Sequence, residues 1–330
     1  MKELNKIFES FNRLKVLIIG DVMLDSYVEG KVTRISPEAP VPIVSATKQE
    51  YRLGGAANVA LNVQSLGATP LLCSVIGDDE RAKEFLNLMK KQKLSTDGIV
   101  KSFLRITTMK TRVIGNNHQL LRVDSETEKE ITVMEATDFF HKTIKKIIAK
   151  QKPDVIIFED YDKGVITKDL IEWVVLFSKS KNIPVAVDPK KKNFLNYKTV
   201  SLFKPNLKEL KEGLKMDFET NDEKKLIAAV EKLKKQLSLS LVLVTLSEKG
   251  ILFNNEKTTK IIPAHIRKIA DVSGAGDTVI SVAALCLALK LPPEIIASLS
   301  NLAGGLVCES VGVVPIDKEK LLQEAQVKLI

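Results

Sequence analysis

Short runs of apolar residues alternate along this chain with longer amphipathic segments, and this alternation constrains the fold more than any other feature. Six such runs, rich in branched side chains, lie at residues 16–19, 71–76, 155–158, 185–187, 200–203 and 241–246. Runs of this kind are typical of parallel strands buried on both faces. Residues 136–149 and 220–237 have helical spacing, with a capping box predicted from Thr220 and Glu223, and residues 292–306 predict a further helix. The sequence therefore predicts an α/β fold with a mostly parallel central sheet.

Two segments, at about residues 28–46 and 103–124, depart from this rhythm because polar and apolar residues alternate singly. That pattern is typical of half-exposed antiparallel strands. We expect them to form a small β-sheet lid on one domain that spans residues 1–330. The apolar face of such a lid must cover a site or pair with a second chain, so we expect a homodimer formed through the lid.

Composition narrows the choice of partner. Lysine and arginine number 50 against 41 acidic residues, but the lysines fall in pairs on predicted helix surfaces and only 5% of residues are aromatic, which argues against nucleic acid. No apolar run reaches the roughly 18 residues of a membrane span, and the N-terminus lacks a signal-peptide pattern. The cysteines and histidines have no metal-ligand spacing. We expect a cytoplasmic protein with reduced thiols, no membrane or nucleic-acid partner, and a small-molecule ligand.

Charged or small polar residues follow each of the six apolar runs. In open α/β sheets, ligands bind beyond the carboxyl ends of the strands. The residues in these positions include Asp25, the segment 159–164, the segment 188–190, Asn206 and Glu209. Together they predict a polar ligand with several anionic and hydroxyl groups.

The most specific motif is Asp271-Val-Ser-Gly-Ala-Gly-Asp-Thr278, which precedes an apolar helix. Glycines at a helix start let backbone N–H groups converge on an anion. Asp277 fits two roles, a helix cap or a general base that takes a proton from an attacking hydroxyl beside a phosphate. Neither a Walker A motif nor GxGxxG is present, so P-loop and dinucleotide-binding folds lack their fingerprints.

A second glycine motif, Gly54-Gly55-Ala-Ala-Asn58, precedes a helical segment that ends at Gly67. The paired glycines permit close approach of the backbone to a ligand. The Asn58 amide can both donate to and accept from sugar hydroxyls. An ordinary turn followed by a helix cap would produce the same pattern, so the motif alone leaves both interpretations open.

At these two motifs, in this order, the chain resembles the ribokinase-like (PfkB) carbohydrate kinases, from about residue 15 to residue 315. Residues 54–67 match the first family signature and residues 271–277 match the second, D-x-x-G-A-G-D. Residues 206–209 resemble the family's N-x-x-E motif, and residues 245–250 resemble its nucleotide loop. The resemblance implies a three-layer ribokinase-like fold with a β lid, and an ATP- and Mg²⁺-dependent sugar kinase.

Residues 20–25, 34–42 and 119–124 further resemble the heptose 7-phosphate 1-kinases. Those enzymes phosphorylate the anomeric hydroxyl of D-glycero-β-D-manno-heptose 7-phosphate to the 1,7-bisphosphate, in ADP-heptose synthesis for lipopolysaccharide. In many bacteria that kinase is fused to a C-terminal adenylyltransferase, and this chain resembles the kinase part. Two alternatives stay open, another PfkB-type sugar or nucleoside kinase and a non-catalytic sugar- or nucleotide-binding regulator.

The resemblance also implies residue roles. Asp277 would be the base, and the transferred phosphoryl group would bind the backbone of Gly274, Ala275 and Gly276. The sugar would contact Asp25, Gly54, Gly55, Asn58 and Asp188, and its phosphate Arg112, Arg122, Lys163 and Lys190. ATP would contact Asn206, Glu209, Thr245, Ser247, Gly250 and Asn301. Glu209 would also hold Mg²⁺ through water, and Asp271 would help to bind a monovalent cation such as K⁺. The chain departs from the family at Asp162 and Ser247, where relatives commonly have glycine.

Overall fold

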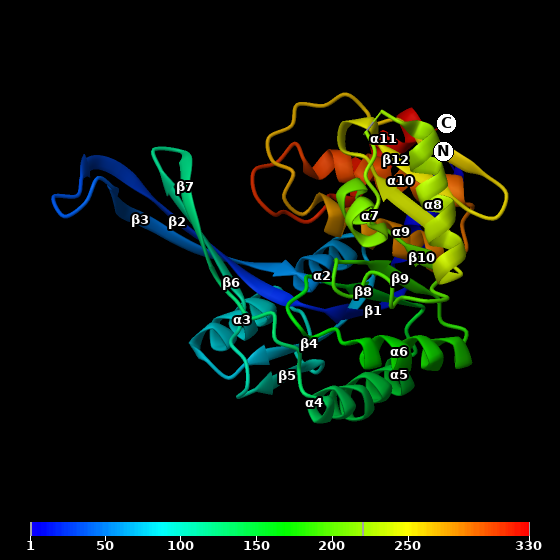
Figure 1. The fold of residues 1–330 in the computed structure, drawn as a ribbon, viewed down its shortest axis with the longest axis horizontal. Coiled ribbons are helices and arrows are strands. Elements are labelled where there is room, and N and C mark those ends of the chain that lie inside the picture. The colour runs from blue at the N-terminus through cyan, green and yellow to red at the C-terminus, as the bar shows by residue number, and fades with distance from the viewer. Residues whose placement is uncertain (1, 220, 330) are drawn as a thin grey trace.

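The structure is a computed structural model that describes residues 2–219 and 221–329. Its main sheet has nine strands in the order β13-β12-β11-β10-β9-β8-β1-β4-β5 (Figure 1). The seven strands from β5 to β11 in this order are parallel, and β12 pairs antiparallel with both β11 and β13. The strands are β1 (Lys15–Gly20), β4 (Thr69–Gly77), β5 (Ile99–Ser102), β8 (Val155–Glu159), β9 (Val185–Asp188), β10 (Leu202–Phe203), β11 (Leu241–Thr245), β12 (Ile251–Asn254) and β13 (Thr259–Ile262).

The sheet is buried on both faces, as the unbroken apolar runs predict. Along β1, Val16 and Ile18 join one hydrophobic cluster, whereas Leu17 and Ile19 join a second cluster on the opposite face. The helices that cover the two faces are α1 (Lys2–Phe11), α2 (Ala56–Ser65), α3 (Glu80–Lys91), α4 (Val133–Asp138), α5 (Lys145–Gln151), α6 (Lys168–Ser180), α7 (Leu207–Leu214), α8 (Glu223–Leu237), α9 (Ala275–Ala288), α10 (Pro293–Val307) and α11 (Lys318–Lys328). The predicted three-layer α/β fold is therefore confirmed.

Two helix predictions differ in detail from the structure. The helix expected at 136–149 is longer, because α4 and α5 are joined by a π-helical stretch, Phe139–Ile144, into one continuous helical segment. Helix α8 begins at Glu223 rather than at residue 220, and the side chain of Asp222 caps it by accepting from the Lys225 N–H. Thr220, which we expected to form the cap, lies outside the described residues.

The lid is a separate four-stranded sheet, in the order β3-β2-β6-β7, that projects from the body as an arm (Figure 1). Its strands are β2 (Val22–Ile35), β3 (Pro42–Gly55), β6 (Met109–Gly115) and β7 (His118–Ser125). The first hairpin is longer than the expected segment 28–46. The second begins later than residue 103, because the Thr107 N–H donates to Asp79 Oδ2 at 2.8 Å and ties this stretch to α3 as a loop.

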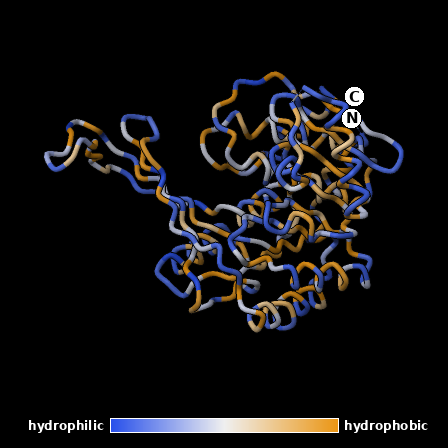
Figure 2. Tube along the Cα trace, in the orientation of Figure 1, coloured by the Kyte–Doolittle hydropathy of each residue, from blue (hydrophilic) through white to orange (hydrophobic). Residues whose placement is uncertain are grey.

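The hydropathy pattern of the chain differs between the body and the lid. The strands inside the body form hydrophobic stretches, whereas apolar and polar residues alternate along the lid (Figure 2). In the part of the chain that the structure describes, no helix combines the length and apolar character that crossing a bilayer requires.

Candidate active site

The Asp277 carboxylate lies where the two glycine motifs meet. Asp277 is in the first turn of α9 and is 5% exposed. Its Oδ2 accepts from the Asn58 Nδ2 of α2 at 2.7 Å, and its Oδ1 accepts from the Tyr161 hydroxyl at 2.8 Å. Both partners are side chains from distant parts of the sequence, and no side chain caps α9 at Gly274. Among the described residues, the Asp277 side chain therefore bonds to Asn58 and Tyr161 and does not cap α9.

The pKa of the Asp277 carboxyl is in the range that a general base requires. Burial raises the pKa of Asp277 to about 6, although the hydrogen bonds from Asn58 and Tyr161 oppose this increase by stabilising the carboxylate. A base works best when its pKa lies near the working pH, because it is then ionised and still accepts a proton readily. Asp277 is thus poised to accept a proton near neutral pH.

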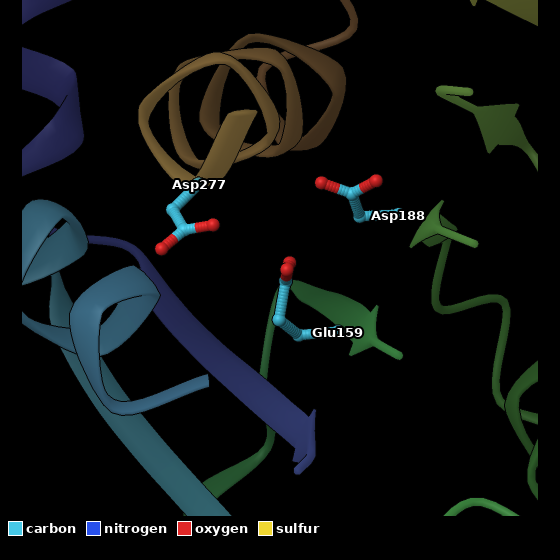
Figure 3. Close-up of side chains that lie close together, drawn as sticks. All are labelled: Glu159, Asp188 and Asp277. Carbon is cyan, nitrogen blue, oxygen red and sulfur yellow. The ribbon is translucent and has the colours of Figure 1, made fainter. Parts of the chain in front are cut away.

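Two further carboxylates lie beside Asp277, one at the end of β8 and one at the end of β9 (Figure 3). One oxygen each from Glu159, Asp188 and Asp277 lie within 4.8 Å of one another. Burial and the neighbouring Asp188 charge raise the pKa of Glu159 well above its usual range. The buried Glu159 Oε2 has no hydrogen-bond partner among the described residues. These three carboxylates form an oxygen-rich group of the kind that binds a divalent cation, which the histidine and cysteine spacing did not indicate.

Glu159 and Tyr161 lie in the segment 159–164 that the sequence placed at the ligand-binding edge, but neither they nor Lys204 received an individual role. Lys204 directly follows β10, and its Nζ lies 2.7 Å from Asp188 Oδ2. Each of the three stands at or just beyond the carboxyl end of a strand, which is the signal that could have selected them. What the sequence lacked was the order of β8, β9 and β10, which makes these strands neighbours.

The expected sugar-binding residues Asp25, Gly54 and Gly55 lie at the base of the lid, where β2 pairs with β3. Asp25 is buried on β2, and a side chain at Gly54 would overlap its carboxylate. Gly55 has φ +60°, and a Cβ there would lie 2.5 Å from the Asp21 carbonyl oxygen. A Cβ at Gly274 would lie 3.0 Å from Asn58 Nδ2. These glycines therefore let polar groups of both motifs approach one another without an intervening side chain.

Each of the four cations expected to bind the sugar's phosphate forms an ion pair, and Arg112 and Arg122 are register partners on β6 and β7. The structure pairs each with a different carboxylate: Arg112 with Asp25, Arg122 with Asp124, Lys163 with Glu126, and Lys190 with Glu209. Arg112 lies beside the expected sugar-binding Asp25, whereas Arg122 is half exposed on β7. The Lys190 ammonium lies 5.4 Å from the centre of the Tyr161 ring and contacts Glu209, so it belongs with the residues expected to bind the nucleotide.

The residues expected to bind ATP are held by local backbone structure. Asn206 and Glu209 form a capping box at the start of α7, and Asn206 forms a bridge to Thr245 at the end of β11. The loop after β11 has a left-handed backbone at Ser247 (φ +53°) and at Gly250 (φ +93°). The motif and the loop therefore converge beside β10 and β11.

Asn301 and Asp271 each form hydrogen bonds with backbone groups. The Asn301 Nδ2 donates to the Pro263 carbonyl oxygen at 2.9 Å, in the segment against which Gly250 packs. The Asp271 carboxylate accepts from the N–H groups of Ser273 and Gly312, each at 2.9 Å. Although burial opposes them, these hydrogen bonds keep the pKa of Asp271 below its usual value, so Asp271 is ionised.

The architecture and site define a class of protein that is already known in solved structures. Phosphofructokinase-2 from Escherichia coli, in complex with potassium, superposes with a TM-score of 0.75 at 16% identity, over 95% of this chain and 99% of that one. Ribokinase from Arabidopsis thaliana, complexed with ribose and ATP, gives a TM-score of 0.72 at 18% identity, over 94% and 99%. The fold is thus ribokinase-like.

Residues 13–320 match the family described as pfkB family carbohydrate kinase, and the chain belongs to this family. The resemblance inferred from the glycine motifs is therefore confirmed. The chain is 37% identical over 325 residues to the bifunctional protein HldE of Geotalea uraniireducens, covering 98% of this chain and 65% of that protein. It is 38% identical over 311 residues to HldE of Methylobacillus flagellatus, covering 94% and 63%. The chain thus spans less than two thirds of the length of these relatives.

Proposed function

We propose that this protein transfers the γ-phosphoryl group of ATP to the anomeric hydroxyl of D-glycero-β-D-manno-heptose 7-phosphate, giving the 1,7-bisphosphate used for ADP-heptose and lipopolysaccharide synthesis. The observation that carries the proposal is the buried Asp277 carboxylate in the first turn of α9, held by Asn58 and Tyr161. Family membership and the similarity to HldE proteins support a sugar kinase. The segments 20–25, 34–42 and 119–124 support the heptose phosphate as acceptor. Because the reaction consumes ATP, we place it in the cytoplasm.

The chemistry follows from the position of Asp277. Its carboxylate takes the proton of the anomeric hydroxyl as that oxygen attacks the γ-phosphorus and the bond from phosphorus to ADP breaks. The N–H groups at the start of α9, at Gly274, Ala275 and Gly276, stabilise charge on the transferred group, and the Ala275 N–H exchanges its 3.3 Å hydrogen bond to the Val272 carbonyl oxygen for this contact. Asn58 and Tyr161 keep the carboxylate aimed at the acceptor.

Metal ions enter the proposal at two places. Glu209 suits Mg²⁺ bound through water, because it caps α7 beside the nucleotide loop. Glu159 offers a buried oxygen that has no hydrogen-bond partner among the described residues. Mg²⁺ bound with ATP would neutralise part of the negative charge of the phosphate groups. Asp271 is ionised, and we propose that it contributes to a K⁺ site.

For the acceptor, we propose that Asp25, Asn58 and the backbone of Gly54 and Gly55 bind sugar hydroxyls, with Asp188 nearby. Of the four candidate cations, Arg112 is the one that forms an ion pair with Asp25, an expected sugar-binding residue, so it is the proposed phosphate ligand. Its guanidinium also lies 5.3 Å from the centre of the Tyr27 ring, which fixes its plane.

A coupled ADP-release assay across phosphorylated and unphosphorylated sugars tests this assignment. We expect turnover with heptose 7-phosphate and little with the same heptose without its phosphate. Arg112→Gln should raise KM for the phosphorylated sugar at least about tenfold, in keeping with the loss of a charge-assisted hydrogen bond. Arg13→Gln, an exposed arginine, is the control. Equal turnover of both sugars, or an unchanged KM in Arg112→Gln, would contradict the acceptor assignment.

We further propose that the protein is a homodimer formed through the lid. Strand β7 is at the edge of the lid sheet, and Leu120, Leu121 and Val123 on it are 40%, 49% and 50% exposed. Ile35 and Val41, at the far end of the first hairpin, are 60% and 52% exposed. Exposed apolar side chains along an open sheet edge favour pairing with a second copy.

A further inference from the structure

Lys204 is a buried lysine that no role described so far uses. It is 2% exposed and follows the two-residue strand β10 at the ligand-binding edge of the main sheet. Its Nζ pairs with Asp188 Oδ2 at 2.7 Å. Removing two opposite charges from water costs more than an apolar pair of similar size would, so an ion pair at this depth is weakly explained by stability alone.

The position of the Lys204 ammonium connects it to the phosphoryl-binding helix start. A Cβ built on Gly276 would lie 3.6 Å from Lys204 Nζ and 3.6 Å from Asp188 Oδ2. Gly276 has no side chain, so nothing of its own separates the ammonium from the first turn of α9. The N–H groups of that turn and the ammonium therefore converge on one small region.

The negative charges around Lys204 explain why a cation is needed at this position. Glu159, Asp188 and Asp277 are close together, and a phosphoryl group arriving at α9 adds further negative charge beside them. Although burial opposes it, the charges of Asp188, Glu209 and Glu159 raise the pKa of Lys204, which keeps it protonated. Lys190, the other cation whose charge acts on Glu159, is held by Glu209.

We propose that Lys204 is a catalytic residue whose ammonium contacts the phosphoryl group during its transfer, beside the amides of α9. This inference rests on the proposed kinase reaction. In that step the bond from the acceptor oxygen to the γ-phosphorus forms, and the bond from that phosphorus to the ADP oxygen breaks with its electron pair leaving on ADP. The hydroxyl proton goes to Asp277, and Lys204 keeps all of its protons.

The test measures binding of Mg·ADP and of Mg·ADP with beryllium trifluoride, a mimic of the γ-phosphoryl group, by calorimetry. Lys204→Gln should weaken the beryllium fluoride complex about 100-fold, as loss of one preorganised donor does, and leave Mg·ADP within about threefold of the wild type. The matched control is Lys232→Gln on the exposed face of α8, which should change neither.

A double variant separates contact with the phosphoryl group from a structural role. Lys204→Gln with Asp188→Asn removes both charges, so no unpaired carboxylate stays buried. We expect its affinity for the beryllium fluoride complex, relative to its own affinity for Mg·ADP, to fall as far as in Lys204→Gln, and it serves as the test if the single variant does not fold. Recovery of the beryllium fluoride complex in the double variant, or equal losses for both ligands, would overturn the proposal.

Neither measurement needs a sugar. If the wild type binds the beryllium fluoride complex but does not turn over heptose 7-phosphate, the acceptor assignment is contradicted. The role of Lys204 is then decided by the nucleotide-binding data alone.

Discussion

Asp277 is the residue on which the proposed chemistry depends, and its environment predicts a pH dependence. Burial raises the pKa of Asp277 from its ordinary value to about 6. The proton acceptor must be ionised, so kcat/KM should rise with pH through about 6 and level off above 7. The Tyr161 hydroxyl stabilises the carboxylate, so Tyr161→Phe should shift this rise to higher pH.

The measurement is the pH profile of kcat/KM for three proteins. Tyr51→Phe, the same chemical change on the lid strand β3, should keep the wild-type profile. If kcat/KM of Tyr161→Phe is lower at every pH but its profile keeps the wild-type pKa, Tyr161 acts only on structure.

At this scale the sequence predicted Asp277 and Asn58 because both stand in motifs whose glycines mark a ligand. It did not predict that Tyr161 and Lys204 share the site. Their selection depends on which strand ends are neighbours, and that is set by sheet order rather than by local sequence. The sequence also did not indicate that each of the four candidate phosphate-binding cations pairs with a carboxylate.

At the scale of elements, two loops keep a backbone shape that glycine usually supplies. Asp162 and Ser247, where relatives commonly have glycine, have φ +56° and +53°. A non-glycine residue in the left-handed region costs roughly 1–2 kcal/mol. The chain thus retains the turn and bears this strain.

Ser247 and Gly250 in the nucleotide loop provide a matched test. Ser247→Gly should leave KM for ATP unchanged and alter the free energy of unfolding by no more than about 1 kcal/mol, with stabilisation favoured. Gly250→Ala should raise KM for ATP or destabilise the protein, because its Cβ would overlap the Ile262 carbonyl oxygen at φ +93°. Urea denaturation and ATP titration measure both effects. A Gly250→Ala variant that behaves like Ser247→Gly would contradict this view of the loop.

The six short apolar runs predicted six strands of the main sheet, because burial on both faces leaves an unbroken pattern. The edge strands β5 and β13 are only partly buried and were not predicted. The short strand β12 was not predicted either, although it is buried and begins with three apolar residues. The alternation of polar and apolar residues predicted the lid, but it did not predict the full length of the lid strands. The inner parts of β2 and β3 are buried near the body and therefore read as continuous apolar or small residues.

On the scale of the whole molecule, the lid predicts the oligomeric state. Static light scattering should give twice the mass of one chain for the wild type. Leu121→Lys places a charge on the edge strand β7 and should give a monomer, whereas Val327→Lys on α11, which is also exposed, should not. A monomeric wild type at micromolar concentration would rule out the proposed lid dimer.

The central claim is that Asp277 activates the acceptor hydroxyl, and the most direct measurement is single-turnover ADP release by the wild type and Asp277→Asn with heptose 7-phosphate. Loss of a general base should slow the step by about 10²–10⁴-fold, while Mg·ADP affinity and thermal stability are retained. Release by Asp277→Asn at the wild-type rate would contradict the claim.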